Sequence, residues 1–121
     1  MVPVWLAAVL LFVAVMALGH RANAHAVVKP ESLDDSALRP NTPTTLVLHF
    51  NAAIHASFSR VYVLNAHGEE TLLKTSPGPS PDTLTVELPA LPVGAYALRY
   101  QVLAADGHYS DNKLRFRILG E

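Results

Sequence analysis

Apolar and polar residues alternate in several short stretches of the chain, a period of two that is typical of β-strands burying one face. The alternation is clearest in Ala95–Val102. We expect the apolar face of this stretch to point into the core, and its residues are Tyr96, Leu98, Tyr100 and Val102. The other predicted strands are Thr44–Phe50, Arg60–Leu64, Thr71–Lys74, Thr83–Leu88 and Leu114–Leu119.

Turn-forming residues separate these stretches. Asn65–Gly68 is predicted to be a hairpin turn, and Thr75–Pro81 a loop, because its three prolines cannot donate to a sheet ladder. Glu31–Leu38 is long enough only for a turn of helix before the prolines that follow it. About seven short strands spaced by turns predict an all-β fold, a Greek-key immunoglobulin-like β-sandwich or small barrel. The cysteines of antibody domains are absent.

The N-terminal residues form a different kind of segment. Val2–Leu18 is almost entirely apolar, and Ala22-Asn23-Ala24 has the small-x-small pattern of a peptidase site. We therefore predict a signal peptide over residues 1–24 and a mature domain over residues 25–121. The alternative is an uncleaved anchor, because no basic residue precedes the apolar run. Its 17 residues lie at the short limit for a spanning helix.

The amino-acid composition excludes several classes of function. The chain of 121 residues has no cysteine, which excludes disulfides, thiolate metal sites and cysteine nucleophiles. Its net charge of −1 argues against a nucleic-acid partner. Cleavage after Ala24 would remove both methionines, the only tryptophan and Arg21, giving an exported domain of net charge −2 with no stable membrane insertion.

His25 would become the first residue of the mature chain. Its α-amine and its imidazole can chelate one metal ion, and such a nitrogen pair suits Cu(II). The alternative is a frayed terminus whose first residue is incidental.

A second candidate is Asp106-Gly107-His108, which follows the clearest strand. Residues two apart on an extended chain point to one side, so Asp106 and His108 could present a carboxylate and an imidazole to one ion. The alternative is an ordinary Asp-Gly turn. Together with His25 these residues offer three nitrogen donors and one oxygen, a set without sulfur that favours Cu(II) over Cu(I).

The other mature histidines are less suggestive. We expect His49 to face solvent, because it alternates with Leu46 and Leu48, and His67 to be exposed in its turn. His55 is a candidate accessory ligand in the loop after the first predicted strand.

These features together resemble the CopC family of periplasmic copper-binding proteins. The matching stretches are HAVVKPESLDDSALRPNTPTTLVLHFN, VGAYALRYQVLAADGH and LRFRI, and the likeness extends over essentially the whole mature chain, from His25 to about Leu119. The resemblance implies a periplasmic Cu(II)-binding protein of copper resistance or homeostasis, with His25, Asp106 and His108 as ligands. It also implies an inner-membrane copper transporter as partner.

The chain departs from the family pattern in places. Ala52 stands where members commonly carry a Glu, Ala105 stands where a Ser often precedes the D-G-H element, and the mature chain has no Met for a Cu(I) site. Two other functions remain open: a metal-free β-sandwich interaction module, and a copper oxidase with a histidine brace. The oxidase is disfavoured because Asp106 would occupy coordination space that such enzymes keep open for substrate. We therefore predict a binding protein that is not an enzyme.

Overall fold

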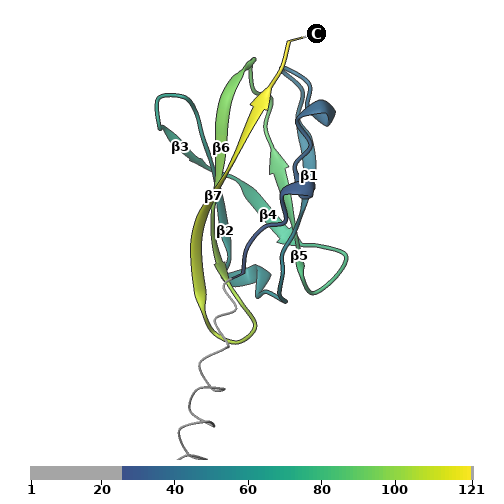
Figure 1. The fold of residues 1–121 in the computed structure, drawn as a ribbon, viewed down its shortest axis with the longest axis vertical. Helices are drawn as coiled ribbons and strands as arrows, with labels where there is room; N and C mark the ends of the chain where they lie inside the picture. The colour runs from purple at the N-terminus through teal and green to yellow at the C-terminus, as the bar shows by residue number, and fades with distance from the viewer. Residues whose placement is uncertain (1–25, 121) are drawn as a thin grey trace, which may run out of the picture.

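The computed structural model describes residues 26–120, so the predicted signal peptide and His25 lie outside the described residues. The described chain folds into two antiparallel sheets packed face to face, which confirms the predicted all-β sandwich (Figure 1). The strands are β1 (Thr44–His49), β2 (Arg60–Leu64), β3 (Glu70–Leu72), β4 (Lys74–Pro77), β5 (Thr83–Leu88), β6 (Gly94–Leu103) and β7 (Tyr109–Ile118). The sheet orders are β1-β5-β4 and β3-β2-β6-β7. No helix within residues 26–120 has the length and apolar character needed to cross a membrane.

The core lies between the two sheets and follows the alternation of the strands. In the small sheet, Leu48 of β1 pairs with Leu84 of β5, and both side chains are fully buried. In the large sheet, the predicted inward face of β6 is confirmed, with Tyr96 only partly buried at its start. Phe50 meets Tyr100 edge to face across the core, with 5.8 Å between ring centroids. Period-two patterning therefore specifies which face of each central strand is buried.

The chain crosses between the sheets at Leu73, which corrects two predictions. Thr71–Lys74 is not one strand, and Thr75–Pro81 is not entirely loop, because β4 pairs with β5 in the small sheet. Leu73 is buried between β3 and β4, and its N–H donates to the carbonyl of Val61. β4 is an edge strand, and the proline at its last position is tolerated there because an edge need not donate on both sides.

β7 begins earlier than predicted, at Tyr109 rather than at Leu114. Its first half pairs with β6 as regularly as its second half, but Asp111, Asn112 and Lys113 are all polar and exposed, so no alternation of apolar and polar residues marks this half in the sequence.

The predicted helical turn in Glu31–Leu38 is two short 3₁₀ turns. The three 3₁₀ turns of the described chain are η1 (Pro30–Ser32), η2 (Asp35–Ala37) and η3 (Ala56–Phe58).

A tyrosine near the start of β6 joins the strand to the preceding corner. The hydroxyl of Tyr96 donates to the carbonyl of Pro92 over 2.7 Å, and its ring stacks on Phe116. Immunoglobulin-like sandwiches carry such a tyrosine corner at the corresponding strand. This contact supports the immunoglobulin-like form of the predicted sandwich.

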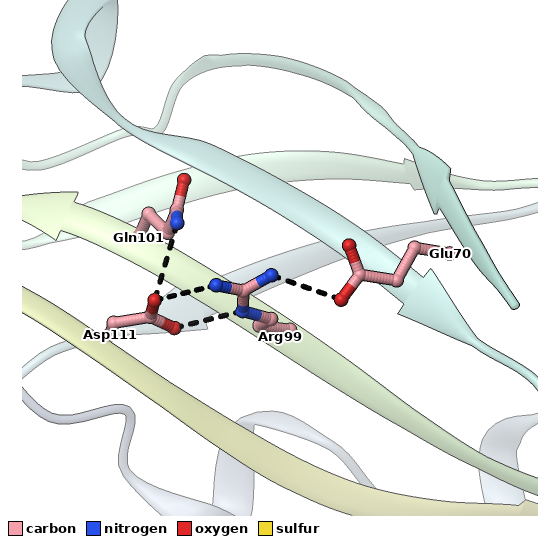
Figure 2. Close-up of polar contacts among 4 residues, drawn as sticks. All are labelled: Glu70, Arg99, Gln101 and Asp111. Carbon is pink, nitrogen blue, oxygen red and sulfur yellow. Dashed lines mark hydrogen bonds and ion pairs between the residues drawn. The ribbon is translucent and has the colours of Figure 1, made fainter. Parts of the chain in front are cut away.

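A polar network ties three strands together on the outer face of the large sheet (Figure 2). Arg99 of β6 donates to both carboxylate oxygens of Asp111 on β7, at 3.0 and 2.7 Å, and to Glu70 on β3 at 2.9 Å. Gln101 adds a hydrogen bond to Asp111. The hydrogen bonds from Arg99 and then from Gln101 lower the pKa of Asp111 below its ordinary value.

We expect the contribution of Asp111 to stability to disappear in acid. Since the pKa of Asp111 is lowered in the folded state, its contribution is complete well above the ordinary value of 3.8. It is lost as the pH falls through the lowered folded pKa. Urea unfolding should show the parent protein more stable than Asp111→Asn at neutral pH, and the two should converge as the pH falls through the lowered pKa of Asp111. The difference should be small because the pair is exposed. The matched control is Glu69→Gln, and a pH-independent difference for Asp111→Asn would contradict the prediction.

Candidate metal centre

Asp106 and His108 lie in the hairpin that connects β6 to β7. Pairing continues one step past the strands, because the N–H of Ala104 donates to the carbonyl of His108 at 2.9 Å. Within the turn, the N–H of Gly107 donates to the carbonyl of Ala104 at 2.9 Å. Gly107 has φ of 93°, the left-handed conformation that closes three-residue hairpin loops and favours glycine. The Asp-Gly pair is therefore a turn, as the alternative interpretation expected.

The same turn brings the two candidate ligands into contact. One carboxylate oxygen of Asp106 accepts the backbone N–H of His108, and the other lies 3.1 Å from the imidazole Nδ1. The backbone hydrogen bond and then the side-chain hydrogen bond lower the pKa of Asp106. Both side chains are about half exposed, at 45% and 58%. We expected an extended backbone to align the two residues, but a left-handed glycine in a tight turn does so instead.

The described chain begins at the same end of the sandwich (Figure 1). Val27 exchanges two hydrogen bonds with Asn51, its N–H donating to the side-chain oxygen at 2.8 Å and its carbonyl accepting the Asn51 N–H at 3.1 Å. Two residues further on, the carbonyl of Ala53 accepts the N–H of Ala105 at 2.9 Å. Since Asn51 and Ala53 are at most about 7 Å apart, the N-terminal segment and the β6–β7 turn flank one short stretch of chain. Ala52, which stands where the resemblance led us to expect a Glu, is the middle residue of that stretch.

The other histidines stand apart from this pair. His55 is exposed at the same end of the molecule, where its backbone N–H donates to Leu103 and its ring meets Phe58 edge to face. His49 and His67 are exposed, as predicted. Within residues 26–120, no three or more His, Asp or Glu side chains are grouped as a metal site requires. Asp106 and His108 thus supply two donors, and a complete site needs further donors.

The distance between the two donor atoms would allow both to bind the same metal ion. Ligand atoms about 2 Å from a metal and at right angles to each other are about 2.8 Å apart, close to the 3.1 Å between the Asp106 oxygen and His108 Nδ1. An oxygen and an imidazole nitrogen without sulfur suit Cu(II), Ni(II) or Zn(II) better than Cu(I). The exposed turn therefore supplies two of the donors that a site for one of these divalent ions requires.

Comparisons with known proteins agree with this architecture. The CopC domain model matches residues 28–119. Among solved structures, CopC from Methylosinus trichosporium OB3b superposes with a TM-score of 0.62 at 23% identity, covering 77% of this chain and 92% of that one. PcoC, a copper resistance protein from Escherichia coli, superposes with a TM-score of 0.51 at 19% identity, covering 67% and 85%. These two likenesses support the fold. No curated protein sequence matches the chain.

Proposed function

The chain belongs to the CopC family, and from that premise we propose that it is an exported, periplasmic protein that binds Cu(II) in copper resistance or homeostasis. The observation that carries the proposal is the exposed Asp106–His108 pair at the end of the sandwich where the described chain begins. PcoC, whose fold this chain shares, is a copper resistance protein. The role of the bound copper is that of cargo.

We propose His25 as the residue that completes the site. Its neighbour Ala26 is fully buried, and Val27 is held by Asn51, so a chain that starts at His25 starts one residue before an anchored segment. Removal of residues 1–24 would free the α-amine as a second nitrogen donor of His25. With Asp106 and His108, the site then has three nitrogens and one oxygen, the tetragonal donor set that Cu(II) prefers.

The absence of sulfur donors sets the oxidation state. Residues 25–121 contain neither Met nor Cys, so the mature domain has no thioether or thiolate to hold Cu(I). A site on an exposed turn can also exchange its ion with another protein. We therefore propose a carrier or buffer of Cu(II), not an enzyme, with an inner-membrane copper transporter as its partner.

The first test is an EPR spectrum of one equivalent of Cu(II) on protein that begins exactly at His25. We expect a single type-2 signal with nitrogen hyperfine structure, because imidazole and amine nitrogens lie in the equatorial plane of a tetragonal ion. The signal should disappear in His108→Ala and persist in His67→Ala, which removes another exposed turn histidine elsewhere in the molecule. Weak, heterogeneous copper binding that ignores His108 would overturn the proposal.

A further inference from the structure

β7 presents a row of cations along an open sheet edge. It is the outermost strand of the order β3-β2-β6-β7 and pairs only with β6 within the described chain. Lys113, Arg115 and Arg117 are exposed and occupy alternate positions, so their side chains share the outer face. Alternate residues of a strand are about 6.7 Å apart, which makes the row regular.

These cations are not neutralised by their neighbours on β6. The register places Ala97 beside Arg115 and Ala95 beside Arg117, and it places Arg99, another cation, beside Lys113. Arg99 is compensated by Asp111 and Glu70, but no side-chain hydrogen bond or ion pair joins the three β7 cations to any residue among 26–120. Two carboxylates lie near the row. Asp111, two residues before Lys113 on the same strand face, attracts Lys113 although it is hydrogen-bonded to Arg99. The carboxylate of Asp35 accepts the backbone N–H of Arg117.

The backbone beside the same cations is available for pairing. In an antiparallel ladder, the N–H and C=O of successive residues point to opposite sides. The carbonyl of His108 points toward β6, where it accepts from Ala104, and the N–H of Arg117 points away, toward Asp35. Lys113 and Arg115 share the parity of Arg117, so their backbone groups also face the open edge. Asp35 covers the edge only at Arg117.

We propose that the β7 edge binds an acidic, extended segment of a partner protein by strand addition. A strand added here would form main-chain hydrogen bonds with Lys113 and Arg115 and would place its outer-face side chains directly opposite the cations. Acidic residues at alternate positions match this spacing.

A second copy of this chain is a poor occupant of the edge. Two β7 edges brought together would place cation against cation, and charged edges of this kind discourage self-association. A neutral strand would leave the charges uncompensated. An acidic strand alone satisfies both the backbone and the side chains. The inference uses no copper ligand, so its failure would leave the proposed function untouched.

The test uses the chain starting at His25 and a short synthetic peptide in which glutamate and threonine alternate. We expect salt-sensitive binding that falls about tenfold or more in the double variant Lys113→Glu, Arg115→Glu. Arg60→Glu makes half that charge change on the same sheet but off the β7 edge, and it should reduce binding less than about twofold. The single variant Arg115→Glu, which makes the same charge change as Arg60→Glu, should weaken binding more than Arg60→Glu does. Should the double variant fail to fold, Arg115→Gln serves instead, with a smaller loss.

Amide hydrogen exchange separates strand addition from simple charge attraction. Bound peptide should slow exchange at Lys113 and Arg115, whose amides face the open edge, and leave Asn112 and Leu114 unchanged. No peptide binding, or binding without this protection, would overturn the proposal. The proposal would also be overturned if the double variant kept its peptide binding but lost binding to phosphatidylglycerol vesicles. The cations would then serve to bind a membrane surface.

Discussion

Protein that carries one extra residue in front of His25 is expected to bind Cu(II) at least about a hundredfold more weakly than protein that begins at His25. The extra residue converts the α-amine into an amide, which removes one nitrogen donor and breaks the chelate ring. Changes to groups that only orient a ligand already cost about ten- to a hundredfold in metal affinity, so loss of a donor should cost no less. Competition with a chromogenic Cu(II) chelator at neutral pH measures the difference.

A matched control separates the amine from the fold. An extra residue added after Glu121 leaves the N-terminus intact and should not change the affinity. The extended and unextended proteins should also unfold at the same urea concentration, because Val27 remains held by Asn51 in both. Equal copper affinity of the two N-terminal forms would remove His25 from the proposed ligand set while leaving Asp106 and His108 in it.

Truncation of Phe50 is expected to cause the largest loss of stability, with Phe50→Ala lowering the free energy of unfolding by about 3–5 kcal/mol. Phe50 is fully buried, and its ring meets Tyr100 across the interface between the sheets. It also bridges to Val28, which holds the N-terminal segment against the sandwich. Removing the ring leaves a cavity where the two sheets and the N-terminal segment meet. Urea denaturation followed by tyrosine fluorescence measures the change.

Phe58 provides the control for this prediction. It is 62% exposed on η3, so Phe58→Ala removes the same atoms with little loss of buried area and should change stability by no more than about 0.5 kcal/mol. If Phe50→Ala does not fold, Phe50→Leu should still fold and lose less than about 1.5 kcal/mol. Equal effects at the two positions would show that the core is not centred on Phe50.

The predicted ligand pair shows which features of the candidate site can be predicted from local sequence. Asp106 and His108 are two residues apart, so any compact turn brings them together, and their identity as a pair could be predicted without a structure. The turn itself could also be predicted, because Asp-Gly favours it. Their exposure at the N-terminal end of the sandwich could not, since it depends on the contacts of Val27 with Asn51 and of Ala53 with Ala105. Those contacts join residues far apart in the chain.

By itself the sequence determined the all-β class, the central strands and their buried faces, because a strand that buries one face must alternate apolar and polar residues. It also determined the chemistry available to a metal site, since residues 25–121 contain nitrogen and oxygen donors and neither Met nor Cys. Only the tertiary structure decided that the chain changes sheets at Leu73, and that β7 begins at Tyr109 and forms an edge. The physical reason is that alternation reports burial of a side chain. Which strand lies beside another, and which edge stays open, depends on long-range packing that no local pattern records.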